Sequence, residues 1–402
     1  MREILSPSSE TETAEAVREA RAARRPIIIE GGGTRAGLGR PVAADRVLST
    51  RGLTGITLYE PAEMVISARA GTPLAEIEKT LASGKQRLAF EPMDHRALFG
   101  TDGAPTIGGV AACNISGPRR IHAGAARDHL IGIRLVNGFG EVVKSGGRVM
   151  KNVTGLDLVK LGCGAHGTLG VLTEVTFKVL PEPETESTLA LHGLDDSKAI
   201  AALSAGLTSP FQVTGAAHLP AGIAAPEAEA LTLLRIEGSP VSVDYRANAL
   251  SKLLASFGAV EVLAAARATQ LWHTVSDVLP LAEPREAAIW RLSVAPSRGP
   301  DVVAALRRKL AARCFYDWGG GLIWLAVAAE GDAGAGAVRE ALAQADGGEG
   351  GHATLIRAAD DIRGRINVFQ PLAAPLMQIS QGIKASFDPD HIVNPGRMYA
   401  GI

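Results

Sequence analysis

The chain has 402 residues, of which 46% are hydrophobic, and its 41 basic and 42 acidic side chains leave a net charge of −1. This length favours two domains, and the balanced charge argues against nucleic acid or an anionic membrane surface as a partner. No apolar run approaches the roughly 18 residues of a membrane-spanning helix, and the first residues lack the apolar region of a signal peptide.

The cysteines are Cys113, Cys163 and Cys314, and they are far apart in the sequence. An odd number of isolated cysteines is typical of reduced thiols in a cytoplasmic protein, and it excludes an iron–sulfur cluster held by cysteines of this chain alone. We therefore expect a cytoplasmic protein, with Cys113 serving as a packing residue.

The first expected elements are a helix and a strand that runs into glycine. Residues 11–24 follow the capping residues Ser8 and Ser9, and Pro26 ends the helix. The apolar run 26–29 then predicts a strand that leads into Gly31, Gly32 and Gly33. Glycines without Cβ atoms allow the backbone to approach a ligand, so this junction is a candidate pyrophosphate loop.

A dinucleotide fold of the Rossmann type is the first alternative for this loop. Gly31-x-Gly33-x-x-Ala36 satisfies its fingerprint. However, Gly37, Gly39 and Pro41 occupy the place of the required helix, and Arg51 stands where an acidic ribose ligand belongs. The context therefore disfavours this alternative.

Two further glycine-rich loops follow, at residues 100–117 and 162–171. Glycine clusters often only turn the chain. Three such loops after β-rich segments would also suit a ligand with two phosphates and two ring systems. In the same region we expect a helix over 74–81, a hairpin of 131–136 with 141–144 around Asn137-Gly-Phe-Gly140, and a strand over 170–180.

A proline-rich break at 181–184 predicts a domain boundary. Beyond it we expect strands near 231–237, 259–263, 288–294, 321–328 and 353–357, and helices near 242–256, 299–312 and 334–345. This order predicts an antiparallel sheet with helices on one face. The expected fold class is α+β, with domains at 1–181 and 186–360 and a segment 361–402 that returns to the first domain.

Several motifs occur in a fixed order along the chain. They are Gly31-Gly-Gly-Thr-Arg35, Thr106-Ile-Gly-Gly-x-x-Ala-x-Asn-x-x-Gly117, Arg127-Asp128, Asn137-Gly-x-Gly140, Lys151-Asn-Val-Thr-Gly-Leu-Asp157, Gly167-Thr-Leu-Gly-Val-Leu-Thr-Glu174 and Phe387-Asp-Pro-Asp-His-Ile-Val-Asn-Pro-Gly-Arg-Met-Tyr399. This series resembles the FAD-binding domain of the vanillyl-alcohol oxidase/p-cresol methylhydroxylase superfamily. Within it, the chain is most similar to the FAD-binding E subunits of bacterial glycolate oxidases.

The resemblance implies an FAD cofactor and the residues that hold it. The matching positions are Gly31, Gly32, Gly33, Thr34, Arg35, Pro92, Gly108, Gly109, Asn114, Ser116, Gly117, Gly170, Val171 and Asn394. Arg35 could equally be a solvated loop residue, and Asn114 a turn-capping amide. Gly33 and Thr34 occupy the place where some relatives carry a tethering histidine, so we expect non-covalent FAD. Gly32→Val should abolish FAD binding by filling space that a phosphate needs.

The implied substrate is a small 2-hydroxy acid, whose oxidation needs a cation for the carboxylate and a group for the hydroxyl proton. Candidate cations are Arg285, Arg291, Arg363 and Arg365, and candidate bases are His95 and His391, although each has a plain solvated alternative. No metal site is expected, since arginines surround His122 and His129. The histidine-rich metal motif of catalytic relatives has no counterpart in the substrate domain.

The resemblance further implies a complex with a larger FAD-linked glycolate oxidase subunit and an iron–sulfur subunit, which could associate peripherally with the inner membrane. In that complex glycolate would be oxidised to glyoxylate. Two alternatives stay open: a self-contained FAD-linked oxidoreductase for another small polar substrate, and a non-catalytic FAD-binding scaffold.

Overall fold

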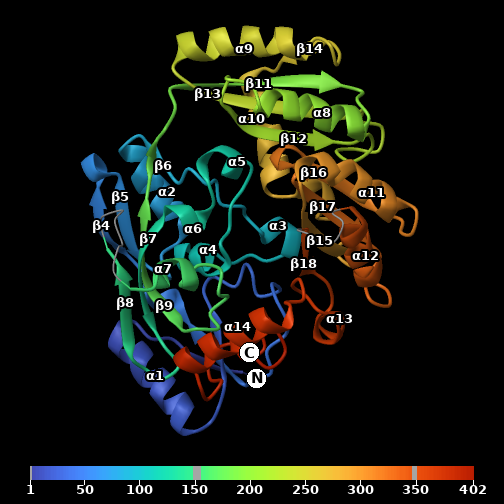
Figure 1. Cartoon of the computed structure of the whole chain (residues 1–402). Coiled ribbons are helices and arrows are strands. Elements are labelled where there is room, and N and C mark those ends of the chain that lie inside the picture. The colour runs from blue at the N-terminus through green and yellow to red at the C-terminus, as the bar shows by residue number, and fades with distance from the viewer. Residues whose placement is uncertain (1, 148–154, 346–350) are drawn as a thin grey trace.

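A computed structural model describes residues 2–147, 155–345 and 351–402, and Figure 1 shows two parts that each have a β-sheet of their own. The motif residues Lys151 to Thr154 lie outside the described ranges. Among the described residues, no helix has both the length and the apolar character to cross a bilayer.

The first part contains two sheets and a short strand pair. The parallel sheet is ordered β1 (Glu3–Leu5), β3 (Arg46–Ser49), β2 (Ile27–Glu30). The antiparallel sheet is ordered β4 (Ile56–Glu60), β5 (Val65–Arg69), β9 (Val171–Lys178), β7 (Leu130–Val136), β8 (Val142–Gly146), and β6 (Gln86–Arg87) pairs with β10 (Leu180–Pro181). Its helices are α1 (Glu10–Ala22), α2 (Leu74–Ser83), α3 (Arg96–Phe99), α4 (Ile107–Cys113), α5 (Arg120–Ala123), α6 (Ala126–His129) and α7 (Leu158–Gly162).

Local sequence signals explain the elements that were predicted in this part. Ser9 caps α1 by accepting a hydrogen bond from the Glu12 N–H, as expected for an N-cap serine. In the β7–β8 hairpin, the Asn137 side chain accepts hydrogen bonds from the Phe139 and Glu141 N–H groups at 3.0 and 2.9 Å. The expected helix, hairpin and strand at 74–81, 131–144 and 170–180 are therefore confirmed.

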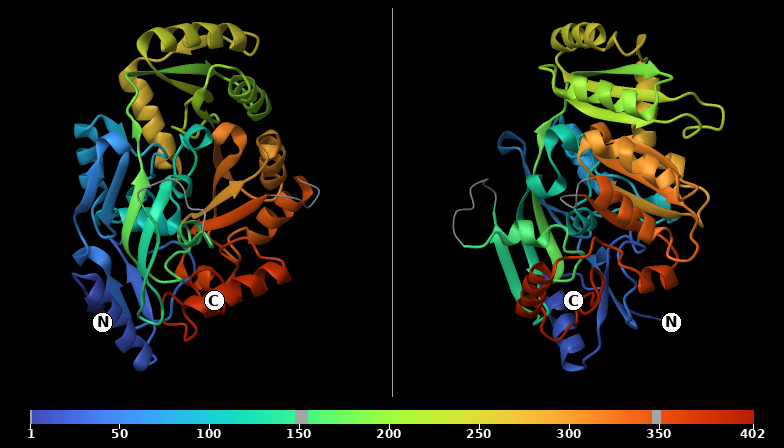
Figure 2. Two further views of the ribbon diagram at one scale, coloured as in Figure 1. Left: turned by 60° about the vertical axis from the view of Figure 1, so that its left-hand side comes forward. Right: turned by 45° about the vertical axis from the view of Figure 1, so that its right-hand side comes forward.

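The second part is an eight-stranded antiparallel sheet. Its order is β14 (Val260–Val262), β11 (Thr185–His192), β13 (Leu231–Gly238), β12 (Val213–Leu219), β16 (Arg313–Asp317), β17 (Leu322–Val327), β15 (Ala288–Ser293), β18 (His352–Arg357). Its helices are α8 (Asp196–Leu207), α9 (Pro240–Leu254), α10 (Ala265–Ser276), α11 (Gly299–Arg307) and α12 (Ala335–Ala345). Helices α8, α9, α11 and α12 share a buried cluster with one face of the sheet, and the second view of Figure 2 shows this layering.

Several elements of the second part were not expected from the sequence. Strands β11, β12 and β16 and helices α8 and α10 were not predicted, and the helix expected over 299–312 ends at Arg307. Every residue of β12 is buried, so the strand has no polar face to produce an alternating pattern. In the first part, helix α4 interrupts the loop expected over 100–117.

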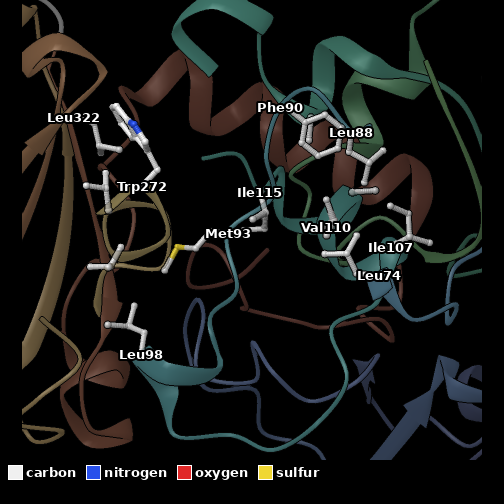
Figure 3. Close-up of a cluster of buried hydrophobic side chains, with 14 of the residues drawn as sticks. Leu74, Leu88, Phe90, Met93, Leu98, Ile107, Val110, Ile115, Trp272 and Leu322 are labelled. Atoms are coloured by element: carbon white, nitrogen blue, oxygen red, sulfur yellow. The ribbon is translucent and has the colours of Figure 1, made fainter. Parts of the chain in front are cut away.

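A single hydrophobic cluster joins the two parts. It contains Phe90 and Val110 from the first part, Trp272 from α10 and Leu322 from the inner face of the large sheet. Figure 3 shows these side chains on both sides of the boundary. The parts therefore pack through an apolar core as well as through polar contacts.

The C-terminal segment passes back to the first part after α13 (Asp360–Arg365) and α14 (Ala374–Phe387). Val393 forms a parallel bridge with Ile27, and the Ile27 N–H donates to the Ile392 carbonyl at 2.8 Å. Figure 1 shows α14 beside the first strands and α1. The segment 361–402 thus contacts the first part, and the division at 1–181, 186–360 and 361–402 stays a prediction.

Candidate functional site

The first cavity lies in the first part, between the three glycine loops and the C-terminal segment. It is lined by backbone of the glycine loops together with a few polar and charged side chains, a lining suited to a small-molecule site. Gly31 to Ala36 form one wall, and residues of α4 form another. His166, Gly167 and Gly170 come from the third loop, while Asn394 and Arg397 come from the C-terminal segment.

The first glycine loop presents unused donors. Within the described residues, none of the backbone N–H groups from Gly31 to Arg35 donates a hydrogen bond. Arg51 instead binds the loop carbonyls, since its Nε donates to Gly31 O and its Nη2 to Gly32 O, both at 3.2 Å. A run of free N–H groups is an anion-binding arrangement. Arg51, which had counted against a Rossmann loop, fixes this arrangement.

Gly32 is needed for loop packing. A Cβ atom on Gly32 would overlap the Ala104 carbonyl oxygen, and one on Gly103 would overlap the Gly32 oxygen. The loss of FAD binding predicted for Gly32→Val therefore has a different first cause from the filling of phosphate space. Such a side chain first separates the first loop from the segment before α4.

Two largely buried arginines add positive charge to the first cavity. Arg35 Nη2 donates to Met93 O at 3.1 Å, and its Nε donates to His95 Nδ1 at 3.3 Å. Arg397 Nη2 donates to Ala36 O at 2.9 Å. Burial lowers the pKa of both guanidinium groups, yet an arginine stays charged in proteins. Both can offset the charge of a pyrophosphate.

Asn394 connects three segments of the chain. Its Oδ1 accepts from the Ile29 N–H at 2.9 Å, and its Nδ2 donates to His166 O at 2.8 Å. The amide group thereby ties the strand before the first loop to the third loop. Its observed contacts assign Asn394 a positioning role at the wall of the first cavity.

The second cavity lies between the two parts of the molecule and continues from the first. Leu38, Cys113 and His166 line both cavities. The other lining residues are Gly39, Met93, His95, Asn114, Ile115, Ser116, Arg291, Trp324, Thr354, Ile356 and Phe369. A long ligand could therefore extend from the glycine loops to the face of the large sheet.

The second cavity contains one cation from the large sheet, Arg291, and two histidines, His95 and His166. Burial and the nearby Arg120 lower the pKa of Arg291 to about 10, so Arg291 is charged at neutral pH. Burial, together with Arg35, holds the pKa of His95 well below 6.5. Because His95 Nδ1 accepts from Arg35, its Nε2 carries the proton and acts as a donor. His95 is thus poorly arranged for the role of base that the sequence suggested.

His166 is a residue of the site that sequence reasoning did not single out. Burial lowers its pKa to about 4, Arg397 adds to that effect, and its ring packs edge-on against Phe369 with centroids 5.1 Å apart. The imidazole is therefore neutral at pH 7. Its position inside the third glycine loop was the only signal available in the sequence.

The structure divides the other sequence candidates into two groups. Asn114 and Ser116 line the second cavity, where they accept hydrogen bonds from the Arg127 and Ala126 N–H groups at 2.9 Å. The remaining candidates are absent from the linings of both cavities: Pro92, Gly117, Val171, Arg285, Arg363, Arg365 and His391. Arg285 and Arg365 are exposed and pair with Glu283 and Asp361.

Comparisons with known proteins agree with this geometry. Residues 2–146 match the family described as an FAD binding domain. The chain is 36% identical to glycolate oxidase subunit GlcE of Escherichia coli (strain K12), over 96% of each chain. It is 25% identical to glycolate oxidase subunit GlcD of Bacillus subtilis (strain 168), over 94% of this chain and 84% of that one.

Solved structures share the fold at low sequence identity. p-Cresol methylhydroxylase with bound substrate gives a TM-score of 0.76 at 12% identity, covering 98% of this chain and 88% of that one. 4-Ethylphenol oxidase from Gulosibacter chungangensis gives 0.71 at 13% identity, covering 99% and 89%.

The fold and the family matches define an FAD-dependent oxidoreductase with an FAD-binding domain of the p-cresol methylhydroxylase type. The α+β fold class expected from the sequence is confirmed. More narrowly, the chain belongs to the family of glycolate oxidase subunit GlcE.

Proposed function

We propose that this chain is the FAD-binding E subunit of a glycolate oxidase that converts glycolate to glyoxylate. The observation that carries the proposal is the pair of joined cavities, because one offers free N–H groups and cations for a pyrophosphate and the other offers Arg291 for a carboxylate. The match to GlcE over nearly the whole chain supports the choice of substrate.

The residues present fit FAD in the first cavity. Backbone N–H groups of Gly31 to Arg35 would bind the phosphates, with Arg35 and Arg397 supplying positive charge. FAD, when bound, supplies the acceptor for the hydride of the substrate. Binding is non-covalent in this proposal. Flavin that stays with the polypeptide after acid precipitation would instead indicate a covalent bond. Cys113 and His166 are the nucleophilic groups in the cavity lining that could form it.

In the second cavity, Arg291 binds the substrate carboxylate, since a guanidinium can donate two parallel hydrogen bonds to it. The neutral His166 ring accepts a hydrogen bond from the hydroxyl, and the His95 Nε2–H donates to a substrate oxygen. The apolar side chains of Trp324, Ile356 and Phe369 restrict the space around them. This arrangement favours a short 2-hydroxy acid.

The complex would contain a larger FAD-linked subunit and an iron–sulfur subunit. To test the proposal, the chain is purified alone and together with both partners, and its flavin absorbance is followed after anaerobic addition of glycolate. Arg291→Gln is compared with Arg298→Gln, which removes an exposed arginine of the second part.

We expect glycolate to bleach the flavin of the complete complex and Arg291→Gln to raise KM at least tenfold, while Arg298→Gln has no effect. Rapid bleaching of the isolated chain by a different 2-hydroxy acid would favour a self-contained enzyme. Flavin of this subunit that never responds in an active complex would favour a scaffold. Either outcome would overturn the proposed function.

A further inference from the structure

Two arginines from different parts of the molecule meet at one indole ring. Arg120, in α5 of the first part, has its Cζ atom 4.6 Å from the Trp318 ring centroid. Arg291, in β15 of the second part, has its Cζ atom 5.1 Å from the same centroid. Trp318 is fixed at this boundary, because its Nε1 donates to Gly117 O at 3.1 Å.

These two guanidinium groups are partly buried and yet lack acceptors. Within the described residues, neither Arg120 nor Arg291 makes a side-chain hydrogen bond or an ion pair. A guanidinium has five N–H donors, and Arg357 of the neighbouring strand shows how a structural arginine uses them. Arg357 donates to the carbonyls of Leu98, Leu281, Ala282, Pro284 and Ala287.

The surroundings also leave excess positive charge. Burial lowers the pKa of both Arg291 and the nearby His352; Arg120 lowers that of Arg291 further, and both arginines lower that of His352 further. The carboxylates that influence the pair are Asp317 for Arg291 and Asp128 for Arg120, and neither forms an ion pair with its arginine. Stacking on Trp318 supplies a cation–π attraction to each guanidinium group, but it leaves their N–H donors unused.

We propose that Arg120 and Arg291 together form an anion site beside Trp318, next to the second cavity that Arg291 lines, and that this site binds a small carboxylate ligand across the boundary between the two parts. Arg120 thereby becomes a second contact for the carboxylate, supplied by the first part. The inference deepens the proposed function and rests on it for the identity of the natural ligand. The anion site itself depends only on the two arginines and Trp318.

The test uses oxalate, a small dianion that carries no oxidisable C–H bond, with the full chain loaded with FAD. Oxalate binding is measured by isothermal titration calorimetry and by the shift of the thermal unfolding midpoint. Wild type is compared with Arg120→Gln, Arg291→Gln and the control Arg298→Gln. Charge-assisted hydrogen bonds are the strong ones in such sites, so we expect each of the first two variants to weaken oxalate binding at least tenfold.

Arg298→Gln should bind oxalate as the wild type does. Arg120→Lys keeps the charge without the fork of donors, so it should restore part of the affinity and serves as a second variant if Arg120→Gln misfolds. Wild-type affinity in folded Arg120→Gln would overturn the proposal, as would an absence of oxalate binding to wild type. If both variants lose oxalate binding while the wild-type complex does not oxidise glycolate, the anion site is upheld. Only the proposed substrate is then rejected.

Discussion

Lys384 and Asp388 form an ion pair inside the protein: Lys384 Nζ lies 2.6 Å from Asp388 Oδ2, and the side chains are 1% and 0% exposed. Lys384 Nζ also donates to Thr168 O and Val393 O at 2.7 and 3.0 Å. Asp388 accepts from the Ile392 and Val393 N–H groups, both at 2.9 Å. The pair thus attaches α14 and the C-terminal segment to the third glycine loop.

Removing one member of this pair should be costly. Lys384→Met leaves the Asp388 carboxylate buried without its cation, and breaking such a pair typically costs about 3–5 kcal/mol. The matched control is Lys309→Met, because Lys309 Nζ lies equally close to Glu340, at 2.6 Å, but the two side chains are 48% and 50% exposed. We expect a change of less than about 1 kcal/mol there. Urea unfolding of both variants checks the difference, and equal losses would contradict it.

Gly32→Ala should reduce FAD binding through the shape of the loop. The added methyl group meets the Ala104 carbonyl, so the first loop must move away from the segment before α4. Gly382→Ala is the control, since a Cβ atom there meets nothing within 4 Å. We expect substoichiometric flavin in Gly32→Ala and full flavin in Gly382→Ala, measured by absorbance at equal protein concentration. Full flavin in Gly32→Ala would show that the loops tolerate the displacement.

His166 should make folding stability depend on pH below neutrality. Burial lowers its folded-state pKa to about 4, while the unfolded value is near 6.5. Above pH 6.5 both states are neutral, and as the pH falls toward 4 only the unfolded chain gains the proton. The expected loss is about 1.4 kcal/mol per pH unit within that window.

The measurement is urea unfolding of wild type and His166→Gln at pH 7 and pH 5. The variant lacks the titrating ring, so its stability should fall by about 2 kcal/mol less than that of wild type over this interval. An identical fall in the two proteins would mean that the His166 ring is hydrated in the folded state.

Asp317 should make folding stability decrease as the pH rises, which is opposite to the effect of His166. Burial raises the pKa of this carboxyl to about 7, even though its Oδ1 accepts a hydrogen bond from the Trp318 N–H. Its contribution to stability is fully present below the unfolded pKa and is lost as the pH rises through about 7. The side chain in Asp317→Asn cannot ionise. The free energy of unfolding of this variant, relative to that of wild type, should therefore rise between pH 4 and 7, by at most about 4 kcal/mol. Urea unfolding at pH 4.5, 6 and 8 checks this, and a constant difference would contradict it.

The sequence predicts those features that depend on residues close together along the chain. The turn at Asn137 and the caps of α1 follow from local hydrogen bonds, and the three glycine loops stand out because glycine clusters follow apolar strands. The resemblance to a known family then supplied the cofactor. These signals locate the first cavity well.

The second cavity could not be predicted in the same way. His95, Arg291, Thr354 and Phe369 come from separate segments, and only the packing of the large sheet against the first part brings them together. Arg285 and Arg291 look alike in the sequence, yet the first is exposed beside Glu283 and the second lines the cavity. The choice between them depends on tertiary structure alone.

The bridge between Ile27 and Val393 has a consequence for biosynthesis. Asn394 accepts a hydrogen bond from Ile29, 365 residues earlier in the chain. Chains emerge from the ribosome beginning at the N-terminus, so the first glycine loop lacks its structural partner until residue 394 has been translated. Flavin binding to this loop is therefore expected only late in translation. A stalled or prematurely terminated product would lack the groups that hold the loop in place.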